Sequence, residues 1–340
     1  MRWSFGFLLV ALLTVILLGG CAERKVTPIG MAVEFNSHAA AAYVTQDKGW
    51  YQAEGIELTG YESYVTGVAL ASALARGDIE VAYICLVPAI NVYANGGVPI
   101  KIVAGTHKCG YGLVVNPEKV RAVNDLGKPG IRIGCVREGG ATDFCLHLTI
   151  DKFGLDQEKV LGNVRRMNPP NQLLAIRSAK LDAAFLPEHW SSLAERFGFR
   201  TMLTAGDIWP EMQGSVLVVK EDLIRYNPDA VVKLVATCRR ATDWINQHPE
   251  EAAEIIARQL GAIGDDVLPT EVASVAKELE IKAGDMERSM GNIEYSVAID
   301  PEVVQQTIDY LAELGYIKSS FDARDILDLR FIDDELAQAD

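Results

Sequence analysis

The chain has 340 residues, of which 49% are hydrophobic and 23% are charged, and its formal net charge is −14. This length is about twice the usual domain size of ~150 residues, so we expect two compact lobes. The composition excludes a disordered or collagen-like chain. Because no basic run interrupts the acidic background, it also excludes a typical nucleic-acid-binding protein.

The N-terminus has the pattern of an export signal. Arg2 is the only charged residue before position 23, and an apolar run leads directly into Gly19-Gly20-Cys21. This pattern predicts a signal peptide over residues 1–20 that ends in a lipobox. The thiol of Cys21 would then take a diacylglycerol group, and residues 21–28 would tether the protein to the extracytoplasmic face of a membrane. An uncleaved membrane anchor is the alternative, because the apolar run is just long enough to span a tilted helix.

Short β-branched runs alternate with helical patterns along the rest of the chain, which is typical of an α/β fold with mainly parallel sheets. A first series predicts strands over residues 30–35, 56–61, 81–84 and 100–104, and helices over 39–47, 67–75 and 89–95. A second series predicts strands over 113–115, 131–135, 164–167, 183–186 and 216–219, and helices over 142–153, 171–178 and 189–197. The remainder is predicted to be helical, with first-turn prolines at Pro228, Pro249, Pro269 and Pro301.

The cysteines and histidines indicate neither disulfides nor a metal site. Apart from Cys21, the cysteines form no C-x-x-C pair and each lies in or beside an apolar run, so we interpret them as small buried hydrophobic residues. The five histidines show no metal-ligand spacing with them. The chain also lacks the G-x-S-x-G, P-loop and H-E-x-x-H motifs, so no catalytic residue, metal or cofactor is predicted.

Polar and glycine-rich turns follow the predicted strands, which is where α/β sheets bind ligands. In the turn that opens the helix after residues 131–135, Gly139 and Gly140 would expose backbone N–H groups to a small anion. Four aromatic side chains could also enclose a planar ring, namely Tyr61, Tyr64, Tyr83 and Trp190. The candidate ligand-binding residues are Asn36, Ser37, His38, Tyr61, Tyr64, Thr66, Gly67, Cys85, His107, Gly139, Gly140, Ala141, Thr142, Glu188 and Trp190.

Some of these residues have a purely structural alternative. The two glycines are equally compatible with a plain connecting loop. His38 is compatible with a buried, hydrogen-bonded side chain, and Glu188 with a cap of the helix that follows it.

Several segments follow one another in a familiar order. They are Lys48-Gly49-Trp50-Tyr51, Ala73-Leu74-Ala75-Arg76-Gly77-Asp78, Leu126-Gly127-Lys128-Pro129-Gly130, Leu181-Asp182-Ala183-Ala184-Phe185 and Trp244-Ile245-Asn246-Gln247-His248-Pro249-Glu250. Together they resemble the substrate-binding proteins of nitrate, sulfonate, taurine and thiamine-precursor importers. The resemblance implies a two-lobed periplasmic-binding-protein type II fold, in which each lobe is a mainly parallel sheet with flanking helices and the ligand lies between the lobes.

This resemblance also implies boundaries and partners. One lobe would comprise residues 29–108 and 215–340, and the other 109–214. The protein would be a monomeric, lipid-anchored receptor in the cell envelope that passes its ligand to an ABC permease driven by an ATPase, without catalysis. The ligand would be a small organic anion, such as a sulfonate, taurine or nitrate, or a nitrogen heterocycle like the thiamine pyrimidine.

An enzyme on the same fold is the alternative, since a pyrimidine-precursor synthase and a chorismate-processing lyase also resemble this family. Either enzyme would be expected in the cytoplasm, so the lipobox favours the receptor.

Overall fold

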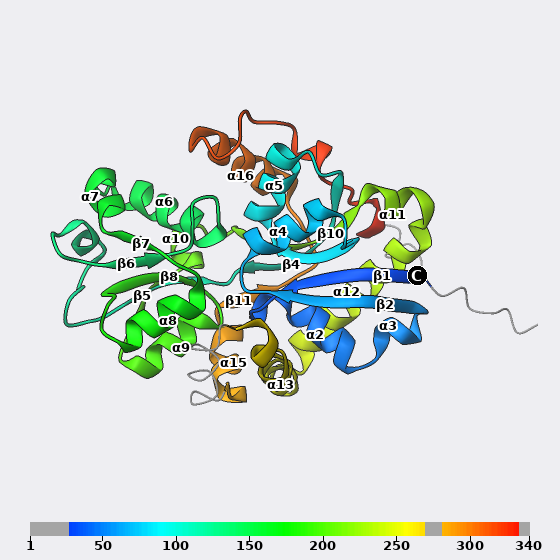
Figure 1. The fold of residues 1–340 in the computed structure, drawn as a ribbon, viewed down its shortest axis with the longest axis horizontal. Helices are drawn as coiled ribbons and strands as arrows, with labels where there is room; N and C mark the ends of the chain where they lie inside the picture. Colours follow the sequence, from blue (N-terminus) through cyan, green and yellow to red (C-terminus); the bar gives the residue numbers. More distant parts are fainter. Residues whose placement is uncertain (1–26, 269–280, 333–340) are drawn as a thin grey trace, which may run out of the picture.

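The computed structural model describes residues 27–268 and 281–332, and Figure 1 shows them as two α/β lobes side by side. The predicted signal peptide and Cys21 lie outside these residues. The first lobe has a sheet with the order β11-β4-β10-β3-β1-β2. Its strands are β1 (Thr27–Glu34), β2 (Ile56–Tyr64), β3 (Val81–Cys85), β4 (Ile100–Cys109), β10 (Gln213–Lys220) and β11 (Ile293–Tyr295).

The second lobe has a sheet with the order β7-β6-β8-β5-β9. Its strands are β5 (Tyr111–Val115), β6 (Ile133–Cys135), β7 (Val164–Arg166), β8 (Ala183–Pro187) and β9 (Arg200–Thr204). Helices α8 (Pro169–Arg177) and α9 (Trp190–Ala194) cover one face of this sheet, and α6 (Ala141–Phe153) covers the other.

Helices also cover both faces of the first sheet (Figure 1). One face carries α2 (Ala40–Asp47), α12 (Pro228–Gln247) and α13 (Pro249–Val267), and the other carries α4 (Gly67–Arg76), α5 (Leu86–Gly96) and α16 (Pro301–Glu313). Met31 and Val33 of β1 pack into one core cluster while Ala32, between them, packs into the other. A strand that is buried on both faces has apolar residues at successive positions. The sequence of β1 shows this pattern, and for this reason a strand was predicted there.

Shorter elements complete the described chain. They are the helices α3 (Trp50–Ala53), α7 (Gln157–Gly162), α10 (Ala205–Ile208), α11 (Glu221–Tyr226) and α15 (Ala283–Met290), and the 3₁₀ turns η2 (Ser37–Ala39), η3 (Val123–Gly127), η4 (Glu195–Phe197) and η5 (Ala323–Asp325). None of the helices within 27–268 and 281–332 is both long enough and apolar enough to cross a membrane.

Local sequence explains where the long helices begin. Pro228, Pro249 and Pro301 occupy the first turns of α12, α13 and α16, as predicted, because a proline there removes an N–H that has no helical partner anyway. Pro269 lies outside the described residues. Thr66 caps α4, since its hydroxyl accepts a hydrogen bond of 3.2 Å from the backbone N–H of Ala69.

The chain changes sheets at two places. Gly110 alone separates β4 from β5, and its φ of +83° lies in the left-handed region that favours glycine. The chain returns through α10 and enters β10 at Gln213. Because β10 then lies between β3 and β4, the second lobe is an insertion within the first.

The sheets are mixed, so the prediction of mainly parallel strands was wrong in this detail. β1 pairs in parallel with β2 and β3, but β10 runs antiparallel to β3 and β4, and β5 runs antiparallel to β8 and β9. The antiparallel strands β4, β5 and β10 adjoin the crossings, where the chain reverses from one lobe into the other. β9 was not predicted, and β11 lies in the part of the chain that was predicted to be helical. β1 begins at Thr27, inside the predicted tether.

Candidate functional site

A cleft of about 360 Å³ lies between the two lobes. The first lobe contributes Glu34, Asn36, Val65, Thr66, Gly67, Val68, Ala69, Cys85 and Pro88. The second lobe contributes Tyr111, Val136, Arg137, Gly140, Ala141, Thr142, Arg166, Met167, Asn168, Pro169 and Pro187. Most of these residues lie where strands end and helices begin, which is the edge at which open α/β sheets bind ligands.

Four of the helices within residues 27–268 and 281–332 begin at this cleft. Their N-cap residues are Thr66 for α4, Cys85 for α5, Gly140 for α6 and Asn168 for α8, and all four residues line it. A helix N-terminus carries a partial positive charge and backbone N–H groups without helical acceptors. The four ends therefore favour negative charge in the space between them.

In the first lobe, this positive potential is met by the protein's own carboxyl group. Glu34 is buried, and its Oε1 accepts a hydrogen bond of 2.6 Å from the backbone N–H of Cys85 at the start of α5. A glycine at position 67 makes room for it, since a Cβ there would lie 2.4 Å from Glu34 Oε1. Burial raises the pKa of Glu34 above its usual value.

In the second lobe, the helix ends face the cleft together with arginines. Arg166 and Arg137 line the cleft next to the N-termini of α6 and α8. The Arg166 guanidinium donates to the buried carboxylate of Asp143 and, at 2.8 Å, to the carbonyl oxygen of Val136. These contacts fix the arginine in place. The two halves of the cleft therefore differ, with an acidic side in the first lobe and a cationic side in the second.

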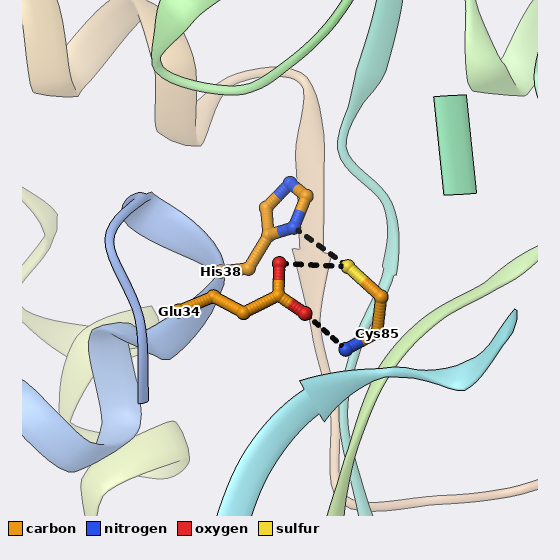
Figure 2. A group of neighbouring side chains, drawn as sticks. All are labelled: Glu34, His38 and Cys85. Carbon is orange, nitrogen blue, oxygen red and sulfur yellow. Dashed lines mark hydrogen bonds between the residues drawn. The ribbon is translucent and has the colours of Figure 1, made fainter. Parts of the chain in front are cut away.

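Three side chains meet at the inner end of the acidic side, as Figure 2 shows. The Sγ of Cys85 lies 3.2 Å from Glu34 Oε2 and 3.8 Å from His38 Nδ1. Glu34 ends β1 and Cys85 ends β3, the strand that pairs with it in parallel, so both side chains reach the same sheet edge. His38 reaches this point from η2 in the turn that follows β1.

Several of the sequence-predicted residues line the cleft. They are Asn36, Thr66, Gly67, Cys85, Gly140, Ala141 and Thr142. Gly139 instead lines an adjoining groove, and its carbonyl oxygen accepts a hydrogen bond of 3.1 Å from Asn91.

The other predicted residues do not line the cleft, because neighbouring side chains enclose them. The Ser37 hydroxyl is 2.8 Å from that of Ser289, and the His38 ring packs 4.2 Å from the ring of His107. Glu188 accepts hydrogen bonds from Ser192 at 2.7 Å and from Asn292 at 2.9 Å.

The aromatic side chains that were predicted to enclose a planar ring do not do so in the structure. Trp190 is buried against Phe35 with ring centroids 6.1 Å apart. Tyr61 packs onto the core that includes α2, and the Tyr64 hydroxyl donates to Glu62. Tyr111 is the aromatic residue that lines the cleft, and the sequence analysis did not select it.

Sequence reasoning also missed the charged residues of the cleft. Glu34 is a single acidic residue at the end of an apolar strand, which is a signal that could have been used. Arg166 ends β7, inside the predicted strand 164–167, and Asn168 belongs to the turn before the next helix, so the rule that selected Gly140 applied equally to this turn. These residues line the cleft only because the two lobes face each other, and no local sequence pattern indicates how the lobes are placed.

Comparison with known structures identifies the fold of this chain. The chain has the two-lobed fold of periplasmic binding proteins. The nitrate-binding protein NrtA from Synechocystis PCC 6803 matches it with a TM-score of 0.76 and 16% identity, over 93% of this chain and 89% of that one. The alkanesulfonate-binding protein SsuA from Xanthomonas axonopodis pv. citri, bound to MOPS, matches with a TM-score of 0.72 and 15% identity, over 89% of this chain and 98% of that one.

The family model of the NMT1-like family matches residues 22–260, and the chain belongs to this family. A protein of Brucella abortus (strain 2308) that is named as a binding protein is 26% identical over 227 residues, which are 64% of this chain. The match spans 66% of that relative's length, slightly less than two thirds.

Proposed function

We propose that the protein is an extracytoplasmic solute-binding receptor of an ABC importer, which captures a small ligand in the cleft and delivers it to a permease. The observation that carries this proposal is the convergence of four helix N-termini, from both lobes, on one cleft. Such a cleft holds a charged solute through many hydrogen bonds without covalent chemistry. The nitrate- and sulfonate-binding relatives support the same role.

The lobes supply the movement that transport requires. The boundaries expected from the sequence, 29–108 with 215–340 and 109–214, shift by one or two residues, because Thr27, Cys109 and Gln213 belong to strands of the first sheet. We propose that the two lobes close on the ligand about the crossings at Gly110 and before Gln213. A permease that binds the closed form more tightly than the open form would couple ligand capture to import.

Binding rather than catalysis is supported by the state of Cys85, whose thiol lies among the described residues that line the cleft. Burial and the neighbouring Glu34 carboxyl group raise the pKa of Cys85 well above its usual value, so the group is a neutral thiol at pH 7. A neutral thiol is a poor nucleophile. We therefore expect purified protein to release its ligand unchanged.

The unequal halves of the cleft define the ligand class. An anionic group fits the second-lobe side, against the N-termini of α6 and α8 and the two arginines. An N–H donor fits the first-lobe side, where Glu34 presents its carboxyl group. We propose a small molecule that carries both groups, such as an amino-sulfonate, which belongs to the class of small organic anions expected from the sequence.

The test compares matched compounds by thermal unfolding. Taurine and ethanesulfonate share the sulfonate and differ in the amine, while 4-aminopyrimidine has N–H donors without the anion. We expect taurine to stabilise most, because a ligand at 100 times its Kd adds about 2.7 kcal/mol to the free energy of unfolding. Thr142→Ala removes a hydroxyl that lines the cleft and should weaken this effect, whereas Thr149→Ala, in the same helix but outside the cleft, should not. Absence of stabilisation by every compound, or turnover of one, contradicts the proposal.

Membrane attachment is a separate part of the proposal. We infer that Cys21 is lipidated after removal of residues 1–20, which would keep the receptor close to its permease. Cys21→Ala is expected to abolish labelling by a radioactive or alkyne-tagged fatty acid, while Cys109→Ala leaves labelling unchanged. Labelled Cys21→Ala protein would disprove the anchor without affecting the proposal for the cleft.

A further inference from the structure

The cluster of Glu34, His38 and Cys85 has a geometry that a bound anion or amine does not require. One donor atom from each residue, a carboxylate oxygen, an imidazole nitrogen and the thiol sulfur, lies within 4.8 Å of the others. The side chains point toward a common centre in Figure 2. The residues are only 4%, 1% and 3% exposed, so this centre is shielded from bulk water.

The hydrogen bonding of His38 leaves one ring nitrogen available. Its Nε2 is 2.6 Å from the carbonyl oxygen of Gly110, and a carbonyl only accepts, so Nε2 carries the proton. Nδ1 therefore presents a lone pair, and it is directed at Cys85 Sγ. Histidines that bind metals typically donate their other N–H to a carbonyl or carboxylate in this way, which fixes the ring and its tautomer.

The spacing between the donor atoms fits a tetrahedral ion. With the bond lengths that zinc makes to sulfur, nitrogen and oxygen, tetrahedral angles give donor separations of about 3.3 to 3.6 Å. The separations in the cluster are 3.8 Å for sulfur to nitrogen and 3.2 Å for sulfur to oxygen. The third separation, from His38 Nδ1 to the Glu34 carboxylate oxygen, is within 4.8 Å, so side-chain movements of up to about 1.4 Å bring all three ligands to bonding distance.

Charge balance favours a divalent cation at this centre. Burial raises the pKa values of Cys85 and Glu34 and lowers the pKa of His38 to about 4. Burial therefore disfavours the charged form of each of the three groups when no ion is bound. A divalent cation with one thiolate, one carboxylate and one neutral imidazole forms a neutral unit, which burial does not penalise.

The other titratable groups around the cluster are neutral, so they add no charge to the centre. His107 packs against His38, and burial lowers its pKa well below the usual value. His189 is neutral for the same reason, with a pKa of about 3. The Tyr111 hydroxyl, 3.1 Å from Cys85 Sγ, has a strongly raised pKa and remains a donor.

We propose that Glu34, His38 and Cys85 form a binding site for a thiophilic divalent metal ion, of which Zn²⁺ fits best. Sulfur and imidazole ligands select such ions over Mg²⁺ and Ca²⁺. Three protein ligands leave a fourth position, and this position faces the cleft because Glu34 and Cys85 line it. The ion would occupy the Glu34 carboxyl group in place of the ligand's N–H donor. The histidine spacing in the sequence predicted no metal.

The test uses the full mature chain, treated with a chelator and titrated with Co²⁺, whose thiolate complexes absorb in the near ultraviolet. We expect one Co²⁺ per chain with a charge-transfer band, and loss of the band when Zn²⁺ displaces it. Cys85→Ser should remove the band, and Cys109→Ser, at a partly exposed cysteine of the same chain, should retain it. No binding by the wild type, or a band that survives in Cys85→Ser, overturns the proposal.

Calorimetry provides a readout that does not depend on a cysteine variant. Because the Cys85 thiol must lose its proton to bind the metal, Zn²⁺ binding at pH 7 should release at least one proton, measured in buffers of different ionisation enthalpy. Glu34→Gln and His38→Gln should each weaken binding by about 100-fold or more. Zn²⁺ binding without proton release overturns the proposal. Because these measurements contain no organic ligand, their failure is distinct from failure of the taurine comparison.

Discussion

Gly110→Ala is expected to lower the free energy of unfolding by about 3 kcal/mol, because the substitution combines two costs. An L-residue is strained at the φ of +83° found there. A Cβ would also lie 2.8 Å from His38 Nε2 and 3.0 Å from His107 Cε1. Both rings are buried, so neither moves away freely. The measurement is urea unfolding followed by circular dichroism.

Gly130→Ala is the matched control for this prediction. Its φ is +85°, nearly the same, but a Cβ at this exposed position has no other atom within 4 Å. It should therefore show the backbone strain alone, about 1 kcal/mol. Equal losses for the two variants would mean that the histidines yield easily and that Gly110 is required only for its backbone conformation.

Arg166→Met should lower the free energy of unfolding by about 2–3 kcal/mol, because it leaves a buried carboxylate without its cation. The side chain of Asp143 is 0% exposed, and that of Arg166 is 29% exposed. After the substitution, Asp143 retains the hydroxyl of Tyr316 and the N–H of Gly139 as donors, which limits the loss. The same variant should also weaken anion binding, since Arg166 lines the cleft.

Two further variants separate these effects. Arg165→Met removes a neighbouring exposed arginine that bonds only to backbone oxygens in the contacts seen, so a change within about 0.5 kcal/mol is expected. Adding Asp143→Asn to Arg166→Met should restore stability without restoring anion binding. If Arg166→Met and Arg165→Met are equally stable, the ion pair with Asp143 contributes nothing to folding.

Much of the fold was predictable from local sequence, because its elements are strongly marked. β3 is buried throughout and appears as an unbroken apolar run, and three of the four selected prolines begin helices. The parallel or antiparallel sense of a strand is different, because it depends on the route of the chain between lobes. β10 has an apolar pattern that fits either direction, so its antiparallel pairing could not be derived from its own residues.

The candidate site was predictable only in part, for a related reason. Thr66 and Gly140 precede helices in recognisable turns, and both line the cleft. His38 occupies an equally suggestive turn, but its ring is directed inward to the carbonyl of Gly110, 72 positions away in the sequence. Cys85 was interpreted mainly as a small hydrophobic residue, and only its neighbours Glu34 and His38 give the thiol a chemical role.

The position of β10 has a consequence for how the protein matures. β3 and β4 are not adjacent in the first sheet, since each pairs with β10, which lies about a hundred residues further along the chain than β4. During synthesis or translocation, one edge of β3 and both edges of β4 therefore stay unpaired while the whole second lobe emerges, since the other partner of β4 is β11. The second sheet, in contrast, is built from consecutive strands β5 to β9 and is complete before β10 appears. We expect the inserted lobe to fold first, and the sheet of the other lobe to be completed only after β10 and β11 have emerged.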